Sequence, residues 1–171
     1  KVQYVGAATV RAKNAGAVRP ASDSEPAIAS WVRAIGGVAT VRDGQLRQID
    51  LATTPVSDEQ LAFLAKLQGL EQLNLQATQT GDLGVVSVSG LRSLKVLDLS
   101  NTTLSDAGLD AVAKLSNLES LRIGGTLVEG PGLMRLAGLP KLRELDLGGT
   151  RVDDRAAGGI AKLTGLKELR M

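Results

Sequence analysis

Residues 94–109 read LKVLDLSNTTLSDAGL, and the same apolar pattern returns every 24 residues without an insertion. The chain therefore carries five aligned columns of apolar residues, a regularity typical of repeat proteins in which each repeat stacks on the next. The columns are Leu67, Leu91, Leu115, Leu139 and Leu163; Leu70, Leu94, Leu118, Leu142 and Leu166; Leu73, Leu97, Leu121, Leu145 and Leu169; Leu75, Leu99, Ile123, Leu147 and Met171; and Leu64, Val88, Val112, Leu136 and Ile160.

The apolar spacing changes within each repeat. Residues 97–99 alternate, which predicts a short strand with one buried face. Residues 109–115 are apolar at every third position, which predicts a short helix or 3₁₀ segment. Among these convex segments we expect residues 61–67 to form a regular helix. Residues 82–90 are rich in Gly, Ser and Val, and we expect them to be irregular.

Polar residues recur with the same period where the chain turns. We interpret one column of threonines as a buried ladder whose hydroxyls satisfy backbone groups, in preference to a row that binds a ligand. Ser57 and Gln60 fit a capping box, and Ser105 and Asp106 are expected to cap the turn that follows them. The threonine column is Thr54, Thr78, Thr102, Thr126 and Thr150.

These residues resemble the leucine-rich-repeat family. The strand signature runs from Leu94 to Thr102, with threonine in place of the family's usual Asn or Cys, and residues 104–109 are similar to the T-D-A-G-L stretch of bacterial repeats. The pattern is similar to planctomycete repeats and, more distantly, to 24-residue GALA repeats. The resemblance covers residues 46–171. It implies an α/β solenoid, a right-handed horseshoe with a parallel concave sheet and short convex helices, and partner binding rather than a reaction.

The residues before the repeats predict a helix followed by a hairpin. The helix has one apolar face, Ser24 to cap it and Pro26 in its first turn. Asp43-Gly44 is a strong hairpin signal, so we expect the helix and hairpin to cover the open end of the solenoid. Trp31 is interpreted as the core anchor of this cap. The apolar face consists of Ile28, Trp31, Val32 and Ile35.

Composition excludes several classes of function. The chain of 171 residues has no Cys and no His, which removes disulfides, Cys/His zinc sites, thiol nucleophiles and imidazole bases. The absence of cysteine is equally compatible with an oxidising and with a reducing compartment. Residues 1–21 carry +4 and the remainder −2, so we expect no nucleic-acid partner. No apolar run is long enough to predict a transmembrane segment.

We divide the chain into three parts. Residues 1–21 are a basic tail or linker, residues 22–48 the cap, and residues 49–171 about five repeats. The last repeat ends on apolar residues with no polar capping segment. We therefore expect either that the chain is a fragment or that another chain covers this end, for example in an end-to-end contact.

The candidate site is the concave face of the strands. The residues that flank the buried leucine of each strand point there and form two rows, one of which has a mixed charge that suits protein recognition. The row is Asp50, Asn74, Asp98, Arg122, Asp146 and Arg170, joined by Gln72 and Glu144 from the neighbouring row. Adjacent strands lie about 4.8 Å apart, so Asp98 and Asp146 are roughly 10 Å apart with Arg122 between them, too far for shared metal ligation.

Phosphate binding and acid–base catalysis at this face are disfavoured. Residues 146–150 resemble a phosphate loop, but the same slot holds DLSNT and RIGGT in other repeats, so repeat register explains them. We expect Glu144 with Asp146, and Glu168 with Arg143, to be surface pairs. The prediction is a non-enzymatic protein-interaction module without cofactor or metal. The alternative is a structural subunit held permanently in a larger assembly, such as a bacterial envelope complex.

Overall fold

The structure, a computed structural model, describes residues 19–171, so all but the last three residues of the expected basic tail lie outside the described part. The elements are α2 (Glu25–Ala34), β1 (Val38–Arg42), β2 (Gln45–Asp50), α3 (Asp58–Leu61), η1 (Ala62–Leu64), β3 (Gln72–Asn74), α4 (Asp82–Val88), β4 (Val96–Asp98), α5 (Leu109–Val112), β5 (Ser120–Arg122), η2 (Pro131–Gly138), β6 (Glu144–Asp146), η3 (Asp154–Ala156), α6 (Ala157–Ile160) and β7 (Glu168–Arg170).

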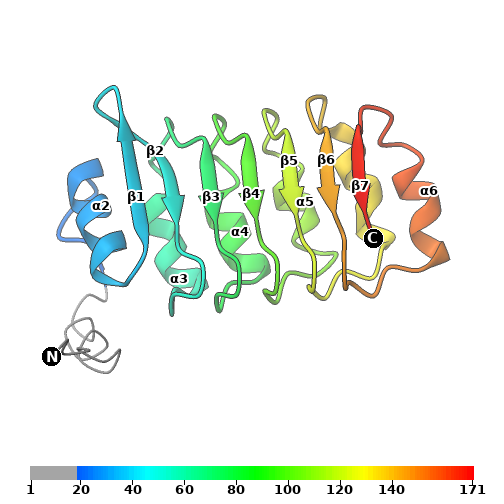
Figure 1. The fold of residues 1–171 in the computed structure, drawn as a ribbon, viewed down its shortest axis with the longest axis horizontal. Helices are drawn as coiled ribbons and strands as arrows, with labels where there is room; N and C mark the ends of the chain where they lie inside the picture. The colour runs from blue at the N-terminus through cyan, green and yellow to red at the C-terminus, as the bar shows by residue number, and fades with distance from the viewer. Residues whose placement is uncertain (1–18) are drawn as a thin grey trace, which may run out of the picture.

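The strands form one sheet in chain order, β1 to β7. The first two strands are antiparallel, and every later pair is parallel. Figure 1 shows the strands side by side in an open row with the helices behind them. Equivalent residues of successive repeats are direct partners, as Leu97 is with Leu121. The predicted α/β solenoid is confirmed.

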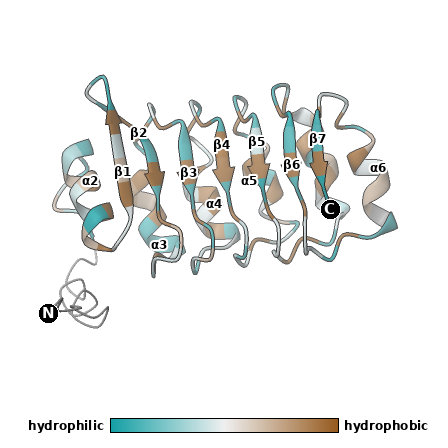
Figure 2. Ribbon diagram, in the orientation of Figure 1, coloured by the Kyte–Doolittle hydropathy of each residue, from teal (hydrophilic) through white to brown (hydrophobic). Residues whose placement is uncertain are grey.

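The apolar columns form one continuous core between the sheet and the convex segments. Leu97 and Leu121 are fully buried in the strand column, and Leu99 and Ile123 are fully buried two residues later. Figure 2 shows apolar colour within every strand of the row. Because every strand contributes side chains to the same layer, stacking one repeat on the next buries what a single repeat would expose.

Two expectations for the convex segments are wrong. The segment at residues 61–67 is not a regular helix: α3 ends at Leu61 and a 3₁₀ turn follows. Leu61, Leu64 and Leu67 are all buried at a spacing of three, which matches the three residues per turn of a 3₁₀ helix. Conversely, α4 is a regular seven-residue helix despite its Gly, Ser and Val content. Burial of its apolar face outweighs its poor propensity.

The threonine column is a ladder, as predicted. Each hydroxyl donates to the backbone carbonyl three residues earlier, for example Thr102 to Leu99 at 2.7 Å. The same bond is made at 2.7 Å in the other four repeats. These hydroxyls therefore close the turn that leaves each strand, and they are used by the fold.

The predicted helix and hairpin pack against the first repeat. Trp31 is 3% exposed, and its ring meets Phe63 of η1 edge-on with 5.7 Å between centroids. The Glu25 carboxylate accepts a hydrogen bond from the backbone N–H of Leu46 at 2.6 Å, which ties the helix to the hairpin. Ser24 stands at the N-cap position, but its side chain makes no capping hydrogen bond, so that expectation is wrong.

A second polar column links consecutive repeats on the convex side. Asp58 accepts the backbone N–H of Gly81 at 2.7 Å, and Asp82 accepts that of Ser105 at 2.8 Å. Asp106 likewise accepts backbone N–H groups of the next repeat, including Glu129 at 2.8 Å. Ser105 does cap its own turn through Ala107, whereas Asp106 caps the repeat after it. The local reading of Asp106 as a cap within its own repeat is therefore wrong.

Candidate functional site

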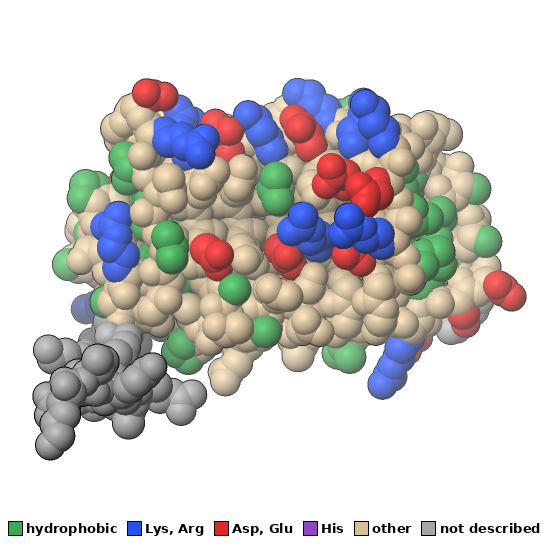
Figure 3. Space-filling model, viewed as in Figure 1, with side chains coloured by type: hydrophobic (Ala, Val, Ile, Leu, Met, Phe, Trp, Pro, Cys, Tyr) green, Lys and Arg blue, Asp and Glu red, His purple; other side chains and the backbone are tan. Residues whose placement is uncertain are grey.

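The predicted row lies along the face of the sheet that the helices leave open, which we call the concave face. Its members are direct strand partners, so six successive side chains stand next to one another across the sheet. Figure 3 views this face and shows few charges over β2–β4 but a cluster of both signs over β5–β7. The face thus has a less charged half over β1–β4, with Asp50 and Asp98 as its acidic residues, and a more charged half over β5–β7.

The acidic and amide members of the row share a structural task. The side-chain oxygen of Asp50 accepts the backbone N–H of Ala52 at 2.9 Å. The same bond to the residue two positions on is made by Asn74, Asp98 and Asp146 at 2.9–3.0 Å. Asp and Asn commonly stabilise turns in this way. Their recurrence in the row is therefore explained by the fold before any partner is considered.

Arg122 departs from this pattern, because a guanidinium has no acceptor for the turn N–H. It is exposed and lies 3.6 Å from the Asp98 carboxylate. Asp98 itself is only 8% exposed, so it offers a partner little surface and serves chiefly to hold its turn and Arg122. Among the row members from β2 to β6, Arg122 is the one whose side chain makes no hydrogen bond to the turn that follows its strand.

The less charged half is hollowed. A cavity of about 310 Å³ lies over β1–β4 and reaches Arg122 at its edge. Most of the side chains that line it are aliphatic groups, amides and hydroxyls, a mixture suited to apolar contact with a few orienting hydrogen bonds. Val38 and Thr40 line it too, and the sequence analysis missed both. The predicted residues that line it are Asp50, Gln72, Asn74, Asp98 and Arg122. Val38 is 61% exposed.

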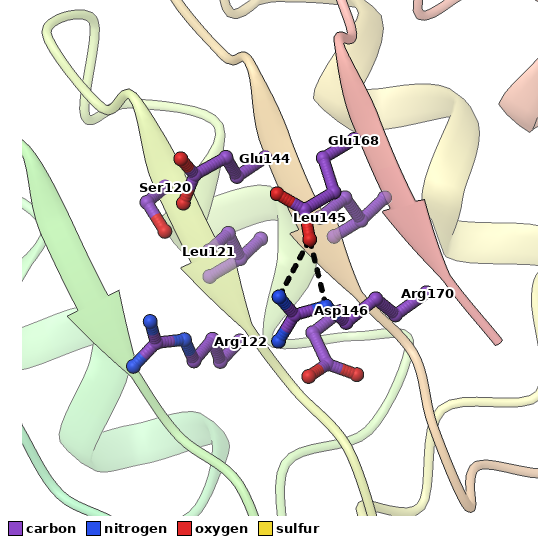
Figure 4. A pocket seen from close by; sticks show the side chains of 8 residues that line it. All are labelled: Ser120, Leu121, Arg122, Glu144, Leu145, Asp146, Glu168 and Arg170. Atoms are coloured by element: carbon purple, nitrogen blue, oxygen red, sulfur yellow. Dashed lines mark hydrogen bonds and ion pairs between the residues drawn. The ribbon is translucent and has the colours of Figure 1, made fainter.

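The charged half contains a pairing that the sequence analysis did not foresee. Arg170 contacts Glu168 on the same strand, with Nε at 2.8 Å and Nη2 at 2.6 Å from the carboxylate (Figure 4). The expected Glu168–Arg143 pair is wrong, because the Arg143 guanidinium instead donates to backbone carbonyls, including that of Gly165 at 3.3 Å. Glu144 and Asp146 both line the small hollow of this half.

A further charged set at the start of the strands was also missed. The Glu71 carboxylate lies 2.9 Å from Lys95 and 3.6 Å from Arg47. The hydrogen bond from Lys95 lowers the pKa of the Glu71 carboxyl below 4.5, and the charges of Lys95 and Arg47 act in the same direction. The signal was present in the sequence, since these three residues also stand 24 apart.

Three further features of the described residues bear on metal binding, on the predicted phosphate-like loop and on membrane insertion. Within residues 19–171, no three acidic side chains gather in a way that could hold a metal ion. The loop 146–150 makes the same local bonds as its counterparts, with Asp146 accepting from Gly148 and Thr150 donating to Leu147. None of the described helices has the length and apolar character required to cross a membrane.

Comparison with known proteins bears on the family. Family models described as leucine rich repeat match residues 59–128 and 138–161, which together make up more than half of the chain. The chain belongs to the leucine-rich-repeat family. No curated protein matches its sequence. The more specific likeness to planctomycete and GALA repeats stays a prediction.

Solved structures show other leucine-rich repeats with the same fold. Internalin C2 from Listeria monocytogenes is 26% identical with a TM-score of 0.62, and the match covers 86% of this chain and 55% of the internalin chain. Another Listeria internalin, InlF, is 22% identical with a TM-score of 0.66, covering 86% and 38%. The ectodomain of the Arabidopsis receptor kinase HAESA is 22% identical with a TM-score of 0.62, covering 86% and 26%. The chain thus spans about half of internalin C2 and less of the others.

The last strand of this leucine-rich-repeat chain leaves apolar side chains in solvent. Leu169 is 38% exposed and Met171 is 72% exposed, whereas Leu145, the partner of Leu169 on β6, is 1% exposed. The difference arises because β7 has a neighbouring strand on one side only within the described residues. The end-to-end contact at this strand stays a prediction.

Proposed function

We propose that the chain is a non-enzymatic protein-interaction module whose concave face binds a segment of a partner protein. Arg122 carries the proposal. It occupies a position where four other repeats use Asp or Asn to hold the turn, and it stands exposed between the hollow of the less charged half and the charged half. A residue that gives up a local stabilising bond without becoming buried is better explained by an outside partner than by the fold.

The surface suits a chain segment rather than a small molecule. The hollow over β1–β4 and the charged half adjoin along the row, so one segment crossing the strands would contact both. Arginine at the centre of such a surface is among the residues that contribute most to binding. The HAESA ectodomain, similar in fold, was solved in complex with a peptide hormone ligand, which supports this mode of use for the fold.

The test is selection of binders from a displayed library of random 15-residue peptides, followed by affinity measurement with purified variants. Arg122→Glu and Arg122→Ala are expected to weaken binding of the enriched peptides at least tenfold, while circular dichroism stays unchanged. Lys114→Glu makes the same charge change at an exposed residue outside the concave rows and is expected to leave affinity intact. Equal affinity for wild type and Arg122→Glu would move the interface to the convex side or an end.

A second candidate is a subunit held permanently in a larger assembly. It is favoured by α4, where Leu83 is 72% and Val86 54% exposed on the convex side. Permanent interfaces are more apolar than transient ones. If this candidate holds, Leu83→Glu with Val86→Glu should raise the solubility of the isolated chain, and peptide binding at the concave face should be absent.

A further inference from the structure

The hydroxyl of Ser120 is a buried polar group without a partner. Ser120 begins β5 and is 7% exposed, and its Oγ makes no hydrogen bond within residues 19–171. The buried threonine hydroxyls nearby behave differently, since Thr126 donates to the Ile123 carbonyl at 2.7 Å. Native proteins leave few such groups unsatisfied, and each one calls for an explanation.

The neighbours of Ser120 point to a cation. Strand register places Ser120 beside Glu144 on β6, and Glu144 beside Glu168 on β7. Two like charges facing each other across strands are unfavourable unless a positive group lies near. Arg170 neutralises Glu168, but no described side chain forms an ion pair or hydrogen bond with the Glu144 carboxylate. Of the two facing glutamates, Glu144 is therefore the one that lacks a counter-charge, while Asp146, which also lines the hollow, accepts the backbone N–H of Gly148.

Figure 4 shows these groups around one small hollow, with Ser120 and Glu144 close together on its β5 side and Arg170 held against Glu168. Arg122, which also lines the hollow, pairs with Asp98 on β4. The hollow measures about 20 Å³, which is room for about one water-sized group. A primary ammonium is that compact and offers three donors and no acceptor, whereas a planar guanidinium is larger.

We propose that this hollow binds a primary ammonium of the partner, supplied by a lysine side chain. The ammonium donates hydrogen bonds to Ser120 Oγ and to the Glu144 carboxylate, so it satisfies the orphan hydroxyl and neutralises the unpaired charge together. The inference rests on the proposed function in that it names the chemistry one residue of the bound segment would have. It gives the charged half of the concave face a defined specificity for one kind of side chain.

The test uses a small probe, so its outcome does not depend on finding a natural partner. N-acetyl-lysine N-methylamide is titrated into ¹⁵N-labelled protein while backbone amide signals are followed. Saturable shifts are expected at Ser120, Leu121 and Glu144. Glu144→Gln should raise the apparent Kd roughly tenfold, because the negative charge that pairs with the ammonium is lost although an acceptor oxygen remains. Ser120→Ala should raise it by a smaller factor.

Matched control probes and variants show which results would contradict the proposal. N-acetyl-norleucine N-methylamide has no ammonium and should give no shifts at these residues. Glu119→Gln makes the same change as Glu144→Gln at an exposed residue outside the hollow, and it should leave the Kd unchanged. N-acetyl-arginine N-methylamide is the third probe and should bind more weakly than the lysine probe. Equal shifts with the norleucine probe, tighter binding of the arginine probe, or a Kd that Glu144→Gln leaves unchanged would overturn the proposal.

The source of the ammonium is separated by alanine N-methylamide, which carries only a free α-amino group. Binding of this probe in place of the capped lysine would overturn the assignment to a side chain and indicate a chain terminus. Library peptides that bind through Arg122 while ignoring Glu144 would leave the proposed function standing and refute the subsite. If no library peptide bound while the lysine probe still shifted the signals of Ser120 and Glu144, the subsite would stand and the proposed function would be refuted.

Discussion

Asp82 on α4 accepts two hydrogen bonds from Ser105 of the next repeat, from the backbone N–H at 2.8 Å and from the hydroxyl at 2.6 Å. Asp58 and Asp106 accept equivalent bonds from backbone N–H groups, so the three carboxylates form a column that joins repeats on the convex side. The leucine core holds repeats together by contact area, which is not directional. These carboxylates make the contact between repeats directional, because each one accepts hydrogen bonds from backbone N–H groups of the next repeat.

Asp82→Ala should therefore lower the free energy of unfolding by about 1–3 kcal/mol, since a part-buried backbone N–H loses its partner. Asp110→Ala provides the control in the next repeat. Its carboxylate is 64% exposed and pairs with Arg135 in solvent, so its loss should cost less than about 1 kcal/mol. Urea denaturation of both variants makes the comparison. Equal losses would show that the inter-repeat bonds add nothing beyond a surface pair.

Gly108→Ala should destabilise the chain although its backbone conformation suits any residue. A Cβ at this position would overlap Asp82 Oδ1 and Leu104 Cδ1. Overpacking of this kind costs roughly 1–3 kcal/mol. Gly158→Ala in α6 meets nothing within 4 Å and should be neutral or stabilising by up to about 1 kcal/mol. Thermal unfolding of the two alanine variants would show the opposite signs, and a loss at both positions would refute the packing argument.

Leu121→Ala should cost about 2–5 kcal/mol, as a fully buried leucine does when it leaves a cavity. The adjacent Arg122→Ala should change stability by no more than about 0.5 kcal/mol, because its side chain is 47% exposed. Chemical denaturation of the pair tests which face of β5 is buried. A larger loss for Arg122→Ala would reverse the assignment of the two faces.

Ser120→Val should raise stability by about 1 kcal/mol, because it removes a buried hydroxyl that has no partner. Valine already occupies the partner position on β4, at Val96. Thr126→Val makes a comparable change where the hydroxyl is bonded, and it should lower stability by about 1 kcal/mol. Calorimetry of both variants checks the signs. Destabilisation by Ser120→Val would mean that its hydroxyl is satisfied by water in solution.

Glu71 makes stability depend on pH in a defined direction. The pKa of its carboxyl is lowered, mainly by the hydrogen bond from Lys95. The stability that this interaction contributes is therefore fully present above pH 4.5, the ordinary pKa of the group, and is lost as the pH falls through the lower pKa of the folded state. Glu71→Gln should flatten the acid limb of the stability curve, measured by urea unfolding between neutral pH and pH 3. NMR titration of a Lys95→Met variant should show the Glu71 pKa moving upward. An unmoved pKa would assign the shift to another group.

The sequence alone determined the period, the strand and convex sides of each repeat, the buried columns and the threonine ladder. It could do so because every repeat carries the same constraint: an apolar side chain at a fixed position is buried wherever a repeat stacks on both sides of it, as Leu145 is and Leu169 is not. The row Asp50 to Arg170 followed for the same reason, since alternation in a strand sets which side chains face away from the core. The helix and hairpin before the repeats were also visible in local signals.

Only the tertiary structure decided what each polar side chain does, because its partner lies in another repeat and distance between repeats is not written in local sequence. Asp106 caps the following repeat rather than its own, Glu168 pairs with Arg170 rather than Arg143, and Asp98 is buried against its turn. Burial of Ser120 Oγ beside an uncompensated Glu144 likewise required the packed strands. Apolar burial depends on pattern, whereas hydrogen bonds and ion pairs depend on ångström geometry that forms only when the repeats stack.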